Sequence, residues 1–128
     1  MTQLTTKNWL SICQIDDILP NMGCCALVPI ADEKKQIAIF RVVSSQGKEQ
    51  LFALDNYCPF SQANVISRGI VGDLTEKIVV ASPLYKQHFE LSSGQCLEDE
   101  DVCLNSYAVR LNGSTVELDS SSPLAAKA

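Results

Sequence analysis

Two short loops decide the fold of this chain: Asn56-Tyr57-Cys58-Pro59-Phe60-Ser61 and Ala81-Ser82-Pro83-Leu84-Tyr85-Lys86-Gln87-His88-Phe89-Glu90-Leu91-Ser92-Ser93-Gly94. Each loop follows a short apolar run, which is Gln50–Leu54 for the first and Lys77–Ala81 for the second. Apolar runs of this length that are bounded by turn residues are typical of β-strands. Both loops are therefore expected at strand ends, and Ser92–Gly94 is expected to turn the chain back.

The rest of the chain also has the pattern of strands. The segments Ile37–Val43 and Gln50–Leu54 flank a Ser44–Gly47 turn, and the segments 107–111 and 115–118 flank Asn112-Gly113, a strong hairpin signal. Further strands are expected over Trp9–Ile15, Cys25–Ile30 and Phe89–Leu91. This series of short strands predicts an all-β fold, a small antiparallel sandwich or barrel.

Length and composition predict one domain. A chain of 128 residues with 46% hydrophobic content is suited to one compact unit with one core. The predicted strands set its bounds at residues 9–118. Residues 1–8 and 119–128 are expected to be flexible ends, because the last segment has too little apolar surface to offset the entropy of ordering it.

The charge and the N-terminal segment limit the partners. Ten Lys and Arg against fifteen Asp and Glu give a net charge of −5, which repels nucleic acids and anionic membrane surfaces. Residues 1–7 lack a basic segment followed by an apolar run, and no stretch of the sequence has the length and apolarity of a membrane span. We expect a soluble, cytoplasmic protein whose partners are other proteins.

Six cysteines raise the question of a metal site. They include no C-x-x-C pair, and His88 is the only histidine, so no zinc-site spacing is present. In a reducing compartment we expect most of these thiols to be small buried hydrophobic groups. The adjacent Cys24 and Cys25 point to opposite faces of a strand, so at most one of them is expected to be exposed. The six are Cys13, Cys24, Cys25, Cys58, Cys96 and Cys103.

The order of these motifs resembles the Rieske-like fold. The resemblance covers roughly Trp9 to Leu118, and it includes the Asp55–Pro59 loop, Gly69–Gly72 before the next strand, and the Ser82–Tyr85 loop with Gly94 after it. Rieske proteins have Cys-Pro-His in the first loop and Cys-Pro-Leu-His in the second, and these two thiolates and two imidazoles hold a [2Fe-2S] cluster.

Three of those four ligand positions are changed here. Cys58 keeps the first thiol, whereas Phe60, Ser82 and Tyr85 stand at the other three positions. A phenyl ring has no lone pair for iron, a Ser hydroxyl ionises only far above neutral pH, and one thiolate does not balance two ferric ions. The sequence therefore predicts two degenerate cluster-binding loops and no metal, cofactor or catalytic residue in this chain.

Within the Rieske-like fold the chain is similar to the small subunits of soluble NADH-dependent nitrite reductases, which keep the fold without the cluster. The resemblance implies a non-catalytic subunit that supports the reduction of nitrite to ammonium in nitrate and nitrite assimilation. It also implies a large subunit, using NADH or NADPH, that carries FAD, an iron–sulfur centre and sirohaem. No small-molecule substrate is expected on this chain itself.

The remodelled loops allow two interpretations. Aromatic and proline side chains bury large area at low entropic cost, so the tip formed by the two loops is a candidate docking surface for the large subunit. Alternatively, the same rings fill the volume of the missing cluster, since an empty cavity is destabilising. The residues concerned are Tyr57, Pro59, Phe60, Pro83, Leu84 and Tyr85.

Two other functions remain open from the sequence. One is a Rieske-type electron carrier that holds a cluster through unusual ligands such as Cys58, Cys96 and His88. The other is a ligand-free adaptor for a different oxidoreductase, such as an aromatic-ring oxygenase system. The colour, iron and sulfide content of anaerobically purified protein separates the carrier from a cluster-free subunit.

Overall fold

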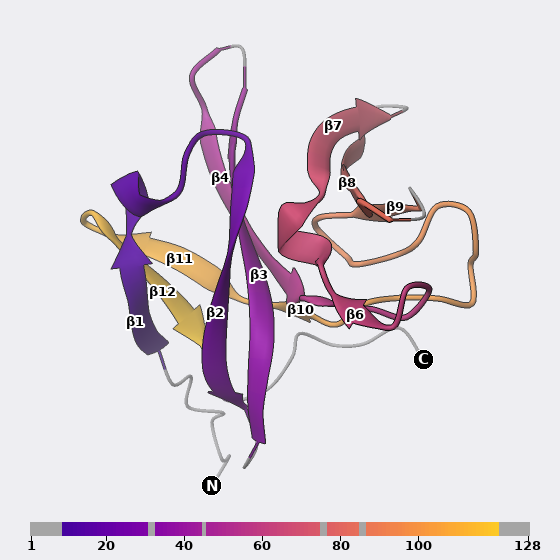
Figure 1. Cartoon of the computed structure of the whole chain (residues 1–128). Coiled ribbons are helices and arrows are strands. Elements are labelled where there is room, and N and C mark those ends of the chain that lie inside the picture. Colours follow the sequence, from indigo (N-terminus) through magenta and orange to yellow (C-terminus); the bar gives the residue numbers. More distant parts are fainter. Residues whose placement is uncertain (1–8, 31–32, 45, 75–76, 85–86, 121–128) are drawn as a thin grey trace, which may run out of the picture.

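The structure, a computed structural model, describes residues 9–30, 33–44, 46–74, 77–84 and 87–120. Within these ranges the chain forms antiparallel strands and two single-turn 3-10 helices, so the all-β prediction is confirmed (Figure 1). No helix in the described ranges is long and apolar enough to cross a membrane. The elements are β1 (Trp9–Gln14), η1 (Ile15–Asp17), β2 (Met22–Ile30), β3 (Glu33–Val43), β4 (Glu49–Asp55), β5 (Tyr57–Cys58), β6 (Ala63–Asn64), η2 (Ile66–Arg68), β7 (Ile70–Leu74), β8 (Lys77–Ala81), β9 (His88–Glu90), β10 (Ser106–Tyr107), β11 (Val109–Asn112) and β12 (Thr115–Asp119).

A central sheet with the order β10-β4-β3-β2 organises the molecule. Along β3 successive side chains point to opposite faces, and Ile37, Ala38, Ile39 and Phe40 are all fully buried. Other elements must therefore pack against Ala38 and Phe40 on one face of the sheet and against the two isoleucines on the other face. This explains why β3 is continuously apolar from Ile37 to Phe40, whereas a half-exposed strand alternates apolar and polar residues.

Each face of the central sheet has its own hydrophobic cluster. The loop-side cluster includes Phe40, Leu54, Cys58 and Phe89, among others. The terminal-strand cluster contains Ile18, Val28, Ile30, Ile37, Ile39, Ala53, Tyr107, Val116 and Leu118. In Figure 1, β1, β11 and β12 lie on one side of β2–β4, and β7–β9 lie on the other. The prediction of a single core is therefore wrong, because the central sheet buries both of its faces.

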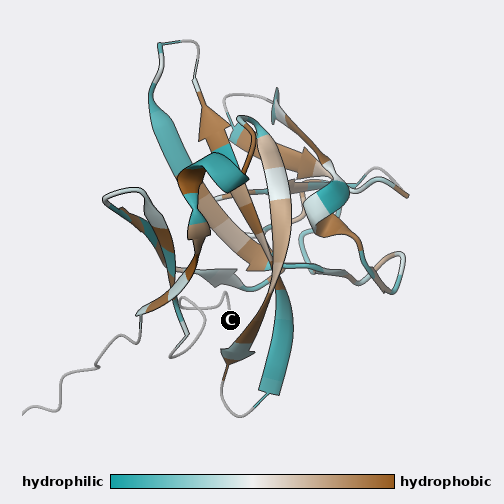
Figure 2. Cartoon of the chain, turned by 60° about the vertical axis from the view of Figure 1, so that its left-hand side comes forward, coloured by the Kyte–Doolittle hydropathy of each residue, from teal (hydrophilic) through white to brown (hydrophobic). Residues whose placement is uncertain are grey.

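Several strand bounds differ from the sequence predictions. The segment Gly69–Gly72 was expected to precede a strand, but Ile70–Leu74 is itself β7 and pairs with β8. The predicted strand 107–111 is divided, since β10 pairs with β4 whereas β11 pairs with β12. The β2–β3 hairpin extends beyond its apolar part, and Figure 2 shows the hydrophilic residues that begin β3.

The C-terminal end of the ordered domain lies beyond the predicted residue 118. Strand β12 pairs with both β1 and β11 and continues through Asp119, and Asp119 and Ser120 are both buried. The backbone N–H of Asp119 donates to the carbonyl of Ala108 at 3.0 Å, which holds the strand end. The predicted flexible ends over 1–8 and 121–128 lie outside the described residues.

The prediction that most of the six thiols are buried is wrong. Only Cys58 and Cys96 are buried, whereas Cys25 and Cys103 are exposed and the other two are partly exposed. The reason lies in the sheet order, because β1 and β2, which carry three of the six thiols, are edge strands. The prediction that at most one of Cys24 and Cys25 is exposed is confirmed.

Candidate functional site

The first loop is a tight turn at the end of β4. Strands β5 and β6 form a two-residue hairpin, with Tyr57 opposite Asn64 and Cys58 opposite Ala63. The turn closes through a hydrogen bond from the Gln62 N–H to the Cys58 carbonyl at 2.7 Å, with Gln62 at a φ of 55°. The hairpin directs the Cys58 side chain inward and leaves Tyr57 exposed.

The second loop connects β8 to β9. The Ser82 N–H donates to the Gln87 carbonyl at 2.8 Å, so the two ends of this loop are joined directly. Ser82 is buried, and the two residues after it, Pro83 and Leu84, are exposed. Of the three residues described at the start of this loop, one therefore points to the interior and two point to the surface.

The structure brings two of the four predicted cluster positions into contact. Cys58 Sγ and Ser82 Oγ are 3.7 Å apart, and both residues are almost completely buried. Phe60 lies at a third position, partly buried, with its ring centroid 6.2 Å from that of Phe89. Tyr85, the fourth position, lies outside the described residues.

Hydrogen-bond donors surround the Cys58 thiol. Burial raises the pKa of Cys58, but hydrogen bonds from the Ser61 hydroxyl, the Ser61 and Phe60 N–H groups and the Ser82 hydroxyl outweigh it, so the pKa lies below its ordinary value. The Ser61 hydroxyl is buried and has no other hydrogen-bond partner among the residues that the structure describes, so it is available to a Cys58 thiolate. The loop thus favours negative charge on sulfur at this position.

This donor set does not fit a [2Fe-2S] cluster. Such a cluster takes four protein ligands, and the described positions offer one thiol, one hydroxyl and a phenyl ring. Among the residues that the structure describes, no group of three or more His, Cys, Asp or Glu side chains is arranged to hold a metal ion. The Phe60 ring packs against the loop-side cluster, as expected if it fills the volume beside Cys58.

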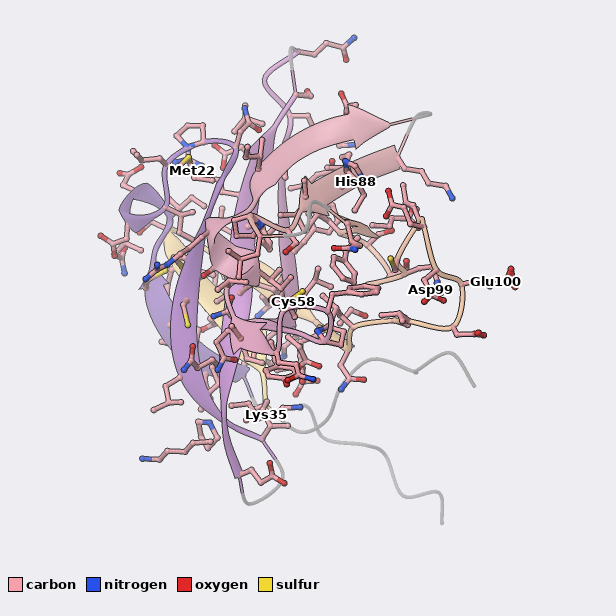
Figure 3. All side chains as sticks on the ribbon, turned by 45° about the vertical axis from the view of Figure 1, so that its right-hand side comes forward. Met22, Lys35, Cys58, His88, Asp99 and Glu100 are labelled. Carbon is pink, nitrogen blue, oxygen red and sulfur yellow. The ribbon has the colours of Figure 1, made fainter. Side chains whose placement is uncertain are left out.

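The alternative ligands predicted from the sequence are engaged elsewhere. His88 Nδ1 lies 2.7 Å from Glu98 Oε2, and the His88 N–H donates to Glu98 Oε1 at 2.8 Å. Cys96 Sγ is 3.7 Å from the same Oε1. In Figure 3, Cys58 lies toward the interior, apart from His88, and Asp99 and Glu100 lie on the outer loop. His88 therefore fixes the acidic loop and does not join Cys58.

The tip of the two loops exposes apolar surface. Tyr57 is 47% exposed and Leu84 57%, and Pro59 and Pro83 are also exposed. Phe60 is the exception, since it turns toward Phe89. The two sequence interpretations thus apply to different residues, with Phe60 filling volume and the other four forming surface.

Sequence analysis missed Asn56, which holds the first loop in place. This buried residue accepts a hydrogen bond from the Ser67 N–H at 2.6 Å on Oδ1. Its Nδ2 donates to Gln36 Oε1 and the Asn64 carbonyl, both at 3.2 Å, and to Cys25 Sγ at 3.4 Å. The only sequence signal is its position, a polar residue between a strand and the Cys-Pro turn.

Comparisons with known proteins identify the same Rieske-like fold. A family model described as a Rieske-like [2Fe-2S] domain matches residues 8–119. The small subunit of the Escherichia coli K12 NADH nitrite reductase is 46% identical over 112 residues, which is 88% of this chain and 97% of that protein. The solution structure of the nitrite reductase [NAD(P)H] small subunit from Erwinia carotovora superposes with a TM-score of 0.69 at 40% identity, covering 94% of this chain and 88% of that chain.

A third relative has a different organisation. The NAD(P)H nitrite reductase large subunit of Klebsiella oxytoca is 34% identical over 113 residues, which is 88% of this chain but only 11% of that protein. The similarity therefore concerns one segment of a much longer polypeptide. Given the matching loops, the full-length identity to the small subunits and the shared fold, this chain belongs to the Rieske-like [2Fe-2S] domain family and, within it, to the small subunits of NADH-dependent nitrite reductase.

Proposed function

We propose that this chain is a non-catalytic small subunit of a cytoplasmic NADH-dependent nitrite reductase, and that it supports nitrite reduction to ammonium in nitrate and nitrite assimilation by binding a large subunit. The observation that supports the partnership most directly is the large subunit of Klebsiella oxytoca, which contains a segment similar to this chain. A domain that is fused to a large subunit in one organism is well suited to bind one as a separate chain in another. FAD, the iron–sulfur centre and sirohaem are proposed for the partner.

We propose further that the chain acts without a cluster of its own. The argument is the donor chemistry of the two loops, where Phe60 and Ser82 stand beside Cys58. Iron and sulfide analysis of anaerobically purified protein tests this point. A colourless protein without iron is expected, and one cluster per chain would contradict the proposal and favour the electron carrier.

The docking surface that we propose is the tip formed by Tyr57, Pro59, Pro83 and Leu84. These side chains come from two separate loops, they are exposed, and two of them are large apolar groups. Proline and aromatic residues lose little conformational entropy when they are buried in an interface, so a tip of this composition suits a protein partner. The exposed edge of the tip would then be covered in the complex.

Binding to the separately purified large subunit tests the surface. We expect Tyr57→Ala and Leu84→Ala each to weaken the affinity at least about fivefold, which corresponds to a truncation cost of more than about 1 kcal/mol for an interface residue. Leu111→Ala is a matched control, because Leu111 is 45% exposed but lies on β11, on the opposite side of β2–β4 from the strands of the second loop. Equal affinities for all three variants would refute the tip as the docking surface.

Activity measurements test the partnership itself. NADH-dependent formation of ammonium from nitrite is measured for the large subunit alone and with one equivalent of this chain. We expect the chain to raise the activity or the thermal stability of the large subunit. No effect on activity, stability or assembly would contradict the subunit role, even if the chain is folded and free of iron.

A further inference from the structure

A second group of thiols lies away from the two loops, on β1 and β2. In the pairing of β1 with β12, Ser11 is opposite Glu117 and Cys13 is opposite Val116, so Ile12 is an extra residue in β1. Residues directly opposite each other in an antiparallel pair point to the same side of the sheet. Val116 is completely buried. Leu10 is opposite buried Leu118 and points inward, so regular alternation along β1 would place Cys13, three residues later, on the outer face. The β-bulge reverses this and turns Cys13 toward the interior.

Cys24 approaches the same interior from the other sheet. It lies on β2 opposite Ile39, which is completely buried in the terminal-strand cluster. Cys13 and Cys24 both pack against this cluster from partly exposed positions. Two strands from different sheets thus present their thiols to one place at the rim of the core.

Each of the two thiols affects the pKa of the other. Burial raises the pKa of both, and the neighbouring charge and hydrogen bond of Cys13 further raise the pKa of Cys24, to about 11. In return, the hydrogen bond from Cys24 favours the ionised form of Cys13. Both groups are protonated at neutral pH, which makes them slow in exchange with disulfides.

The pair is open to solvent through a groove. A groove of about 470 Å³ is lined by Cys13 and Cys24 together with Asp17 and Cys25. The Asp17 carboxylate adds negative charge beside the two thiols, as its effect on both of their pKa values shows. A small cation therefore has access to the pair and an electrostatic reason to approach it.

We propose that Cys13 and Cys24 form a two-thiol binding site for a soft monovalent metal ion of the Cu(I) class. On binding, two S–H bonds are broken and two S–Cu bonds form, two protons pass to solvent, and no atom changes its oxidation state. Soft thiolates select Cu(I), and two ligands are sufficient for this ion. Zinc takes four ligands in structural sites, and no group of three or more ligand side chains is arranged for a metal in the described residues.

Anaerobic titration tests the site. The full chain, fully reduced, competes for Cu(I) with a chromogenic Cu(I) chelator, and C13S and C24S are compared with C25S and C103S. We expect the first two variants to lose at least about 100-fold in affinity, since changes to groups that only support a ligand already cost up to that factor. C25S is the matched control from the same groove, and C103S is a control from an exposed site elsewhere. Wild-type affinity in C13S and C24S, or an equal loss in C25S, would overturn the proposal.

A second measurement on the wild-type chain avoids any folding defect of the variants. The chain is treated with N-ethylmaleimide with and without one equivalent of Cu(I), and the modified cysteines are identified by peptide mass mapping. We expect Cu(I) to protect Cys13 and Cys24 and to leave Cys25 and Cys103 reactive. Protection of Cys25 or Cys103 in place of the pair, or a disulfide between Cys13 and Cys24 in place of bound copper, would refute the metal site.

Discussion

Replacing Gly94 by Ala tests how the turn after β9 is held to the rest of the domain. Gly94 follows β9 and has a φ of 82°, a conformation that side chains rarely adopt. Its N–H donates to the Glu90 carbonyl at 2.7 Å, and its carbonyl accepts from the Leu104 N–H at 2.8 Å. A Cβ atom at this position would collide with the carbonyl oxygen of Leu104, which is backbone and has little freedom to move.

Gly47 provides a matched control for the backbone conformation. Its φ is 83°, nearly identical to that of Gly94, but a Cβ atom there would meet no atom within 4 Å. The left-handed conformation costs Ala about 1–2 kcal/mol, and the reduced entropy of the unfolded chain returns about 0.4–1 kcal/mol, in both variants. These contributions cancel in the comparison. Only Gly94→Ala has the additional collision, which costs about 1–3 kcal/mol by analogy with overpacked cores.

Urea unfolding followed by circular dichroism measures this difference. We expect Gly47→Ala to lower the free energy of unfolding by less than about 1.5 kcal/mol. Gly94→Ala should lower it by about 1–3 kcal/mol more, or prevent folding while Gly47→Ala still folds. If both variants lose the same stability, the contact between Gly94 and Leu104 does not constrain the turn after β9 and the reasoning fails.

Three further predictions concern the loops and their supports. Asn56→Ala should lower the free energy of unfolding by about 1–3 kcal/mol, because it removes a buried side chain that is hydrogen-bonded to Ser67, Gln36 and Asn64. A loss below about 0.5 kcal/mol in urea unfolding would contradict this. Ser82→Cys should form a disulfide with Cys58 on mild oxidation, because Cys58 Sγ and Ser82 Oγ are 3.7 Å apart. If mass spectrometry finds both thiols free after oxidation, the two loops are farther apart than in this structure. Burial raises the pKa of Glu98, but the hydrogen bonds and charge of His88 outweigh this and lower it from 4.5. The contact therefore stabilises the fold fully above pH 4.5, and this stabilisation is lost as the pH falls through the lower pKa of the folded state. Glu98→Gln should remove this part of the acid dependence of stability, an effect below about 1 kcal/mol because the carboxylate is half exposed. An unchanged acid dependence in this variant would argue against the contact.

The sequence by itself determined the fold class and the family. These predictions rest on local signals, namely the strand-forming apolar runs, the Asn112-Gly113 turn and the two Pro-containing loops. Local signals are recognised from the sequence without the tertiary structure. The replacement of three cluster ligands by Phe60, Ser82 and Tyr85 is also recognised from the sequence, because ligand chemistry depends on residue type. The role of Phe60 was left open between filling volume and docking, since both use the same ring.

Tertiary structure alone decided which side chains meet. The contacts of Cys58 with Ser82 and of Asn56 with Gln36 and Cys25 join residues that are 20 to 31 positions apart, and pairing across strands has no local signal. The direction of Cys13 depends on a bulge of one residue in the register of β1 with β12, which reverses the simple alternation along the strand. The two separate clusters arise because β3 is covered on both faces; its apolar run indicates burial on both faces, but not which elements cover each face.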